Sequence, residues 1–165
     1  MNTTTIRLAE DPDLDTLCDL YYEFHEFHAQ HLPNYLHTLD YSSAKEREEL
    51  RYKIKDSIQG NDSTILVGDC SGRVIGFAEL YLKRPDPTNH AVVPKQYVHL
   101  QSLSVTEDFR REGVGNQLLQ AAEAWARHRG AVELRLDIWE FSAGPLGFYE
   151  KSGYHTFRRT LAKNL

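Results

Sequence analysis

Residues 110–116, Arg110-Arg111-Glu112-Gly113-Val114-Gly115-Asn116, have the composition of an anion-binding turn. They follow an apolar run at residues 99–105 and precede an amphipathic helical pattern. The first N–H groups of a helix have no partner within the helix, and the helix dipole favours negative charge at that end. The two glycines let the main chain approach a ligand closely. The turn therefore predicts a bound phosphate group, such as the pyrophosphate of a cofactor.

Two common phosphate-binding motifs do not match this turn. A Walker loop needs Gly-Lys-Ser/Thr, whereas the chain has Gly115-Asn116-Gln117. In the dinucleotide-binding fingerprint, Leu118 stands where a third glycine is needed, and no βαβ unit precedes the turn. An isolated Gly-x-Gly also occurs in ordinary turns that enter a helix, so the surrounding elements must decide its function.

The composition fits one globular domain. The chain has 165 residues, of which 41% are hydrophobic and 26% charged, enough for a single core over residues 1–165. Cys18 and Cys70 lie far apart and form no zinc-binding or disulfide pattern, which favours a reducing, cytoplasmic setting. Residues 1–7 do not resemble a secretory leader, and no apolar run is long enough to span a membrane.

Charge is distributed unevenly along the chain. The net charge is −5, but residues 1–50 carry 11 acidic against 3 basic residues, and residues 101–165 carry 8 against 9. The acidic part would attract a cation, or else these residues are simply solvated helix faces. No basic stripe interleaved with aromatic residues is present, so nucleic acid is not an expected partner.

Apolar periodicity and turn residues divide the chain into helices and strands. The predicted elements are, in order, a strand at residues 6–8, a helix capped at Asp11-Pro12 and ended by Pro33, a helix capped by Ser43 and Glu46 and ended by Gly60, strands at residues 64–69, 74–82 and 97–105, a helix from Val114 to Gly130, a strand over Leu134, Leu136 and Ile138, a short helix at residues 145–151 and a strand at residues 155–161. This order predicts a mixed α/β layer fold.

Alternation assigns the side chains of the strand at residues 97–105 to two faces. One face carries Val98, Leu100, Ser102 and Ser104, and the other carries Tyr97, His99, Gln101, Leu103 and Val105. The side chains of His99 and Gln101 are therefore expected to point in the same direction.

The C-terminal half resembles the GCN5-related N-acetyltransferase (GNAT) superfamily. The similarity is carried by Leu103-Ser104-Val105, Arg110-x-x-Gly113-x-Gly115, Leu134-x-Leu136-x-Ile138 and Phe148-Tyr149-Glu150-Lys151-Ser152-Gly153-Tyr154, in the same order and spacing as in the family. Gly76 in the preceding hairpin is also similar to the family pattern. The resemblance implies a single α/β domain with a mixed, mostly antiparallel central sheet flanked by helices.

The resemblance further implies that acetyl-CoA is a co-substrate. Its pyrophosphate would lie on the turn amides, and its pantetheine would run along the strand that ends at Val105. The residues that match the family's cofactor-binding pattern are Leu103, Ser104, Val105, Arg110, Arg111, Glu112, Gly113, Val114, Gly115, Asn116, Ser142 and Phe148. Ser142 replaces an asparagine that is frequent in the family, and Pro145 replaces an alanine. Serine still donates a hydrogen bond, although with a shorter reach.

Transfer of an acetyl group to an amine requires a proton acceptor, because an alkylammonium is not nucleophilic. With a pKa of about 10.4, its deprotonation at pH 7 costs about 4.6 kcal/mol. Some arylalkylamine-acetylating members carry two histidines in a run that resembles residues 99–105, and polyamine-acetylating members carry glutamate at the position of Gln101. Glutamine is not a useful base, so His99 is the preferred one, unless it is only a hydrogen-bonded structural residue. Glu79 is a further candidate to bind or deprotonate the ammonium, with a surface salt bridge as the alternative.

Tyr149 matches the family tyrosine that protonates the departing CoA thiolate. The alternative is that its ring only packs against the cofactor or the core. A thiolate with a pKa of about 8.5 demands less of an acid than the ammonium demands of a base. We therefore expect Tyr149 to matter less than the group that activates the amine.

The predicted reaction is direct transfer of acetyl from acetyl-CoA to a primary amine of a small molecule or peptide, in a ternary complex. Glu23, Glu26 and Gln101 are the candidate residues for binding a cationic acceptor. His25, His28 and His31 spread around their helix and do not predict a metal site. The oligomeric state is left open by the sequence, with a homodimer as the common default for soluble oligomers and in the family that the chain resembles. The alternative function is a non-catalytic acyl-CoA sensor or partner-docking module.

Overall fold

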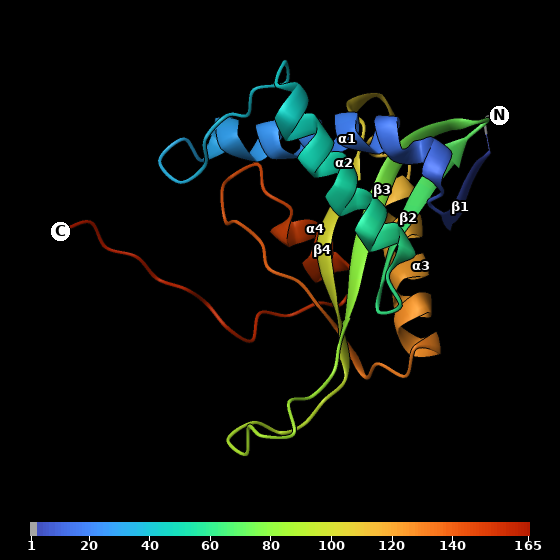
Figure 1. Ribbon diagram of the computed structural model, residues 1–165. Coiled ribbons are helices and arrows are strands. Elements are labelled where there is room, and N and C mark those ends of the chain that lie inside the picture. The colour runs from blue at the N-terminus through green and yellow to red at the C-terminus, as the bar shows by residue number, and fades with distance from the viewer. Residues whose placement is uncertain (1–2) are drawn as a thin grey trace.

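The computed structural model describes residues 3–165. Over these residues, helices alternate with strands of one sheet in nearly the predicted order (Figure 1). The strands are β1 (Thr4–Leu8), β2 (Ser63–Cys70), β3 (Arg73–Lys83), β4 (Tyr97–Val105) and β5 (Glu133–Arg135), and the helices are α1 (Leu14–His31), α2 (Ala44–Gln59), α3 (Val114–His128) and α4 (Leu146–Lys151). The boundaries of β4 and the start of α3 agree with the sequence prediction to the residue.

The strands form an open sheet in the order β1-β2-β3-β4-β5. The β1–β2, β2–β3 and β3–β4 pairs are antiparallel, whereas β4 and β5 are parallel because α3 crosses over between them. The mixed, mostly antiparallel sheet flanked by helices is therefore confirmed. The loop between β3 and β4 extends well beyond the sheet (Figure 1).

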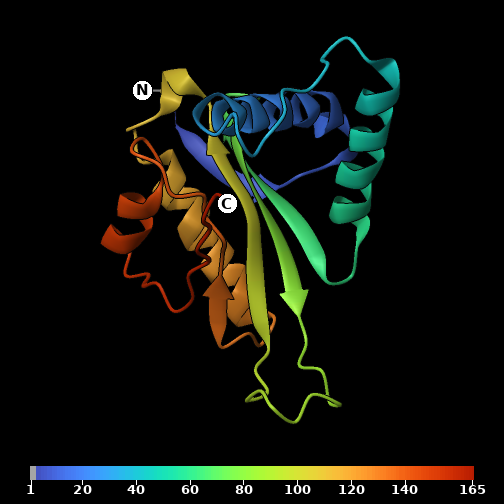
Figure 2. The same cartoon turned by 90° about the vertical axis from the view of Figure 1, so that its left-hand side faces the viewer.

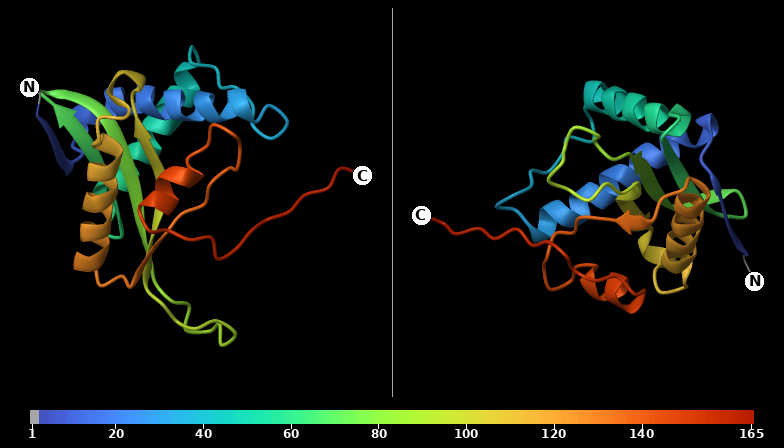
Figure 3. Two further views of the ribbon diagram at one scale, coloured as in Figure 1. Left: turned by 180° about the vertical axis from the view of Figure 1, so that it is seen from behind. Right: turned by 90° about the horizontal axis from the view of Figure 1, so that it is seen from below.

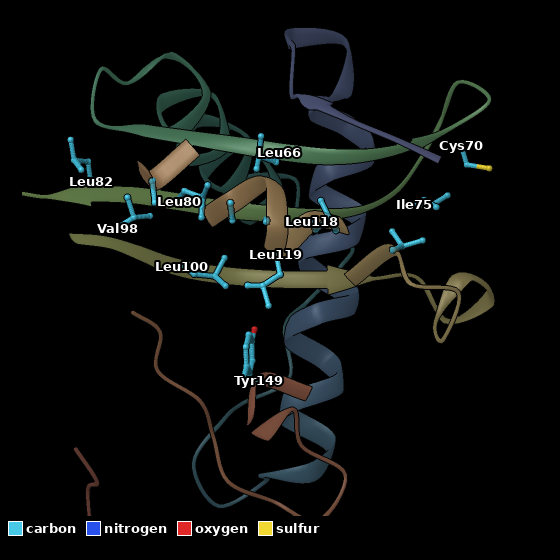
Figure 4. Packing of buried hydrophobic residues seen from close by; sticks show 14 residues of the cluster. Leu66, Cys70, Ile75, Leu80, Leu82, Val98, Leu100, Leu118, Leu119 and Tyr149 are labelled. Carbon is cyan, nitrogen blue, oxygen red and sulfur yellow. The ribbon is translucent and has the colours of Figure 1, made fainter. Parts of the chain in front are cut away.

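Helices cover both faces of this sheet, with α1 and α2 on one side and α3 and α4 on the other (Figure 3, right). On the α3 side, one core cluster is formed by Leu66, Cys70, Ile75, Ala78, Leu80, Leu82, Val98, Leu100, Val114, Leu118, Leu119, Ala122, Ala126 and Tyr149 (Figure 4). On the α1 side, a second cluster contains Ala9, Leu14, Leu17, Cys18, Leu20, Ile54, Ile65, Val67, Val74 and Phe77. The sheet thus separates two cores, and each side presents its own surface to a ligand.

The two helices that cover the same face of the sheet, α1 and α2, start in different ways. α2 begins with the predicted cap, in which the Ser43 hydroxyl accepts a hydrogen bond from the Glu46 N–H. α1 begins at Leu14, after a 3-10 turn at residues 11–13. The predicted cap at Asp11 is wrong, because the Asp13 carboxylate accepts from the Glu10 N–H and is held by Arg7. The Arg7 guanidinium lowers the pKa of Asp13, an effect that burial opposes.

Two sequence predictions at the C-terminal end are wrong. The predicted strand over Leu134, Leu136 and Ile138 ends at Arg135, and residues 155–161 form no strand. The segment from residue 155 onward is exposed and extends away from the body of the molecule, and 68% of the Phe157 surface is accessible (Figure 1). Its alternating sequence favours a strand, but a strand also needs a partner edge, which sequence alternation does not supply.

Gly76 allows β3 to approach β4 closely at the end of the sheet that carries the anion-binding turn. A Cβ atom at this position would lie 2.6 Å from the Ser104 carbonyl oxygen and 3.2 Å from Val105 Cα. Both contacts are with backbone, so a side chain is accommodated only if the two strands separate.

We therefore expect Gly76→Ala to lower the free energy of unfolding by about 1–3 kcal/mol, measured by urea denaturation. Gly147→Ala is the matched control, because a Cβ there meets no atom of the described residues within 4 Å. Alanine at that helical position should leave stability unchanged or raise it by up to about 1 kcal/mol. Equal losses in both variants would contradict the close-approach argument.

Candidate active site

The parallel pairing between β4 and β5 is short, and the two chains then separate. Tyr97, Val98 and His99 pair with Glu133, Leu134 and Arg135. Beyond these residues β4 continues to Val105, while the chain after β5 turns away towards α4 (Figure 2). Within the part of the chain that the structure describes, no strand pairs with this edge of β4 from Leu100 onward. The backbone groups on this edge of β4 therefore have no strand partner and can bind an extended ligand, and we call the region beside this edge the wedge.

A β-bulge at Gln101 changes the direction of the side chains along β4. Glu79 pairs with Ser102 and Leu80 pairs with Leu100, so Gln101 has no residue opposite it. Ser102 and Ser104 therefore share the α1 face with Glu79, whereas Leu100 packs into the α3-side core. The predicted grouping of Val98 and Leu100 with the two serines is wrong, as is the grouping of Leu103 and Val105 with His99.

The predicted anion-binding turn lies where β4 leads into α3. Arg111 has φ 68° and Gly113 has φ 86°, both in the left-handed region, and α3 begins at Val114. Gly113 is the N-cap residue, and no side chain caps the helix. The first N–H groups of α3 are thus available to an anion.

The Arg110 side chain holds the end of β4 in place. Its Nε donates a 2.9 Å hydrogen bond to the Val105 carbonyl oxygen, and its guanidinium lies 3.5 Å from the Glu23 carboxylate. The guanidinium carbon also stacks over the Phe27 ring at 5.4 Å from the centroid. Arg110 therefore joins α1 to the start of the turn, and two of the predicted site residues, Arg110 and Glu23, contact each other.

The start of α3, the end of β4 and α4 meet at Gly115. A Cβ atom on this glycine would lie 3.6 Å from the Phe148 ring and 3.9 Å from the Val105 side chain. The fold thus brings together Val105, Gly115 and Phe148, which the sequence assigned to one cofactor. Ser142, from the same predicted set, is exposed in the loop before α4.

Tyr149 lies on α4, at the far side of the wedge from β4. Its side chain packs in the α3-side core, and its hydroxyl points towards Leu119 and Leu100 (Figure 4). Burial raises the pKa of Tyr149 to about 12. The hydroxyl therefore stays protonated at neutral pH and can donate a hydrogen bond.

The loop after β5 packs against the C-terminal half of α1. The Phe141 ring stacks on His31 with centroids 4.9 Å apart and lies 5.9 Å from Phe27. Trp139 and Tyr35 form a similar contact at 5.7 Å. The sequence showed the aromatic residues of α1 but gave no signal for their partners, because the contact joins segments more than 100 residues apart.

A pocket of about 320 Å³ lies between α2 and the α1-side face of β3 and β4. Its lining residues are Tyr21, Leu50, Tyr52, Lys53, Ile54, Asp56, Ser57, Glu79, Tyr81 and Gln101. The Glu79 side chain is buried, with 7% of the residue exposed. Its Oε1 atom accepts hydrogen bonds from the Ser57 hydroxyl at 2.9 Å and from the Tyr81 hydroxyl at 2.6 Å. Glu79 is therefore a structured carboxylate and not part of a surface salt bridge.

Two tyrosines beside Glu79 were missed by the sequence analysis as site residues. Burial, and then the Glu79 contact, raise the pKa of Tyr81 to about 12. Burial and the Glu79 carboxylate also raise the pKa of Tyr21 well above its usual value. Tyr81 follows Glu79 by two residues on one strand, so a search for same-face neighbours would have found it. Tyr21 was identified only as part of the apolar stripe of α1.

His99 lies on the same face as this pocket, opposite Tyr81 in the neighbouring strand. It is half-buried, and burial lowers its pKa, while nearby Asp137 and a hydrogen bond with Gln101 oppose that shift. The prediction that His99 and Gln101 point in the same direction is confirmed by this contact. His99 is therefore a neutral imidazole at pH 7, able to accept a proton.

The second predicted acidic residue of α1, Glu26, holds the loop that follows the helix. Its carboxylate accepts a hydrogen bond of 3.1 Å from the Leu39 N–H.

Within residues 3–165, no group of three or more His, Cys, Asp or Glu side chains is arranged to hold a metal ion. The same residues contain no helix with the length and apolar character needed to cross a bilayer.

Comparison with known sequences identifies relatives along most of the chain. The model of the acetyltransferase (GNAT) family matches residues 15–154. The uncharacterised N-acetyltransferase YhfO of Bacillus subtilis is 28% identical over 149 residues, which are 90% of this chain and 88% of that protein. Aminoglycoside N(6′)-acetyltransferase type 1 of Klebsiella aerogenes is 32% identical over 96 residues, 54% of this chain and 61% of that enzyme.

Solved structures share the fold. A variant of the BH1408 protein from Bacillus halodurans superimposes with a TM-score of 0.86 at 20% identity, over 98% of this chain and 99% of that one. AAC(6′)-Iy, in complex with the bisubstrate analogue CoA-S-monomethyl-acetylneamine, superimposes with a TM-score of 0.72 at 18% identity, over 99% and 98% of the two chains. From its sequence match and its fold, the chain belongs to the GNAT family of acetyltransferases.

Proposed function

We propose that this protein transfers an acetyl group directly from acetyl-CoA to a primary amine, with both substrates bound at once. The observation that carries the proposal is the wedge beside β4, which leads to the anion-binding turn at the start of α3. An extended pantetheine with two amides matches an unpaired strand edge, and a pyrophosphate matches free helix N–H groups. In this arrangement the thioester lies near the bulge at Gln101.

The cofactor is held mainly by backbone groups in this proposal. The amides of Arg111 to Asn116 bind the pyrophosphate, and the β4 edge at residues 103–105 binds the pantetheine. Phe148 and Ser142 close the wedge from the α4 side, while Arg110 fixes the turn through Val105. A backbone N–H of β4 near the thioester polarises its carbonyl oxygen, as in an oxyanion hole.

His99 is the proposed acceptor of the amine proton. The imidazole is neutral at pH 7 and lies on β4 itself, next to the strand edge that holds the thioester. Glu79 lies one strand further from that edge, and its Oε1 atom is engaged by two hydroxyl groups. The position of His99 therefore favours it over Glu79 as the base.

Tyr149 is proposed to donate a hydrogen bond to the departing thiolate. With its pKa at about 12 and a thiol pKa near about 8.5, complete proton transfer is uphill by about 5 kcal/mol. A hydrogen bond across the wedge stabilises the developing negative charge without that cost. This role agrees with the smaller importance that the sequence assigns to the acid.

The proposal is tested by measuring thiol release from acetyl-CoA with a panel of primary amines, beside a thermal-shift titration with acetyl-CoA. We expect amine-dependent thiol release, and stabilisation by about 2.7 kcal/mol at an acetyl-CoA concentration of about 100 times Kd. Binding of acetyl-CoA without turnover of any amine class would favour the sensor or docking module. Absence of both would reject the cofactor site as well.

For Tyr149→Phe we expect kcat at saturating substrates to fall by about 10- to 100-fold, the value of one hydrogen bond to a charged group. Tyr154→Phe is the control, because the Tyr154 hydroxyl bonds to Glu123 on α3. That variant should retain kcat. An unchanged kcat in Tyr149→Phe would limit Tyr149 to packing.

The pH profile of kcat/KM tests His99. A neutral imidazole is needed, so the rate should rise with pH through an ionisation below about 6.5, the usual pKa of histidine, because burial lowers the pKa of His99. Deprotonation of the alkylammonium substrate in solution to the free amine adds a second rise in kcat/KM at higher pH. His99→Ala should lower the rate by about 100-fold or more and remove only the first ionisation. A variant profile with the first ionisation intact would mean that another group accepts the proton.

A further inference from the structure

The pocket between α2 and the sheet contains a buried carboxylate that lacks a cationic partner. Glu79 accepts hydrogen bonds from Ser57 and Tyr81, both at Oε1, and no Lys, Arg or His within residues 3–165 forms an ion pair with it. Lys53 and Asp56 both line the exposed part of the pocket, where their opposite charges offset each other. A buried carboxylate without a counter-ion is costly, and a bound cation would compensate that cost.

The remaining polar groups of the pocket match an alkylammonium, which has three N–H donors. The Glu79 Oε2 atom receives no hydrogen bond from the described residues. The Tyr21 hydroxyl is buried beside the Glu79 carboxylate, where its oxygen still has acceptor capacity, and its ring stacks on Phe77 of β3 at 4.3 Å. Gln101 also lines the pocket, and its side chain carries an amide oxygen that can accept a hydrogen bond. These three oxygens provide one acceptor for each N–H of the ammonium.

This ammonium is not the amine that reacts. Glu79 lies opposite Ser102 on β3, on the far side of β4 from the wedge. One strand spacing separates β3 from β4, and a second separates β4 from the proposed cofactor. Glu79 therefore lies about 10 Å from the thioester. An ammonium that is hydrogen-bonded to Glu79 lies about 2.8 Å closer to the thioester than Glu79 itself. The distance between this ammonium and a nitrogen at the thioester is therefore about 7 Å.

We propose that the acceptor carries a second cationic group, bound by Glu79, Tyr21 and Gln101, at about 7 Å from the reacting amine. An extended chain advances about 1.2 Å per bond, so a spacer of about six bonds fits this separation. The substrate class is a slender aliphatic diamine, or an amine with a cation at the same distance. The inference rests on the proposed acetyl transfer, because the wedge fixes where the reacting amine lies.

Cadaverine and n-pentylamine form a matched pair of probes, because they share a five-carbon chain and differ in the second ammonium. We expect kcat/KM at pH 7 to favour cadaverine by about tenfold or more, beyond the statistical factor of two for its two ends, as a charged hydrogen-bonded contact predicts. Ethylenediamine is too short to reach both positions and should lose this advantage. Glu79→Gln keeps the size of the side chain and an acceptor oxygen for Ser57, and it should abolish most of the preference for cadaverine.

Glu49→Gln is the control, because it removes the same charge from an exposed position on α2 that does not line the pocket. It should keep the full preference. Equal kcat/KM for the two amines in the wild type would overturn the inference, as would an equal loss for both amines in Glu79→Gln. Thermal shifts with CoA and each amine report binding separately from turnover. If neither amine were acetylated but cadaverine still bound more tightly than n-pentylamine in a way that Glu79→Gln abolishes, the proposed acetyl transfer would be contradicted. The cation site would then still be supported.

Discussion

The site depends on one constraint, which is that β4 loses its parallel partner after His99. An unpaired strand edge exposes N–H and C=O groups that tend to pair with any available strand. Here Tyr149 packs into the α3-side core and Phe148 lies beside Gly115 of α3, so α4 is fixed by contacts on the α3 side of the sheet. The chain after β5 is also held away from β4, through the contacts of Phe141 with α1. The segments that follow β5 are thus fixed by packing contacts.

In the proposed reaction, the bulge at Gln101 lets one strand contact both substrates. Before the bulge, Leu100 packs in the α3-side core, and after it Ser102 and Ser104 point to the α1 side. The edge of β4 and the α1-side face of the same strand therefore meet within a few residues, which is where the proposal puts the donor and the acceptor side by side. A regular strand would place Ser102 with Leu100. The bulge is in this sense the structural link between the two halves of the reaction.

Local sequence determined much of this fold, and the failures arise where the structure is non-local. The bounds of β4 and the start of α3 were predicted from sequence because alternation and a glycine-bounded helical stripe are local signals, whereas the end of α3 at His128 was predicted only approximately. The bulge at Gln101 was not predicted, because it is defined by the register between β3 and β4, which alternation along one strand does not reveal. The same reason explains residues 155–161, whose β propensity finds no partner within the described residues. For the site, the cofactor turn was visible in sequence, whereas the Ser57–Glu79–Tyr81 network joins α2 to β3 and was not.

Ion pairs within the fold neutralise part of the acidic excess of residues 1–50. Arg47, Arg51 and Lys55 on α2 pair with Asp19, Asp15 and Asp11 near the start of α1, and Arg110 pairs with Glu23. Three of these pairs join α2 to α1 or to the turn before it, so these carboxylates have a structural role. Such exposed pairs contribute little each, up to about 1 kcal/mol. Among residues 3–165, Glu79 is a buried carboxylate without an ion pair, and it lies outside the acidic region, so the proposal assigns specificity for a charged acceptor to β3.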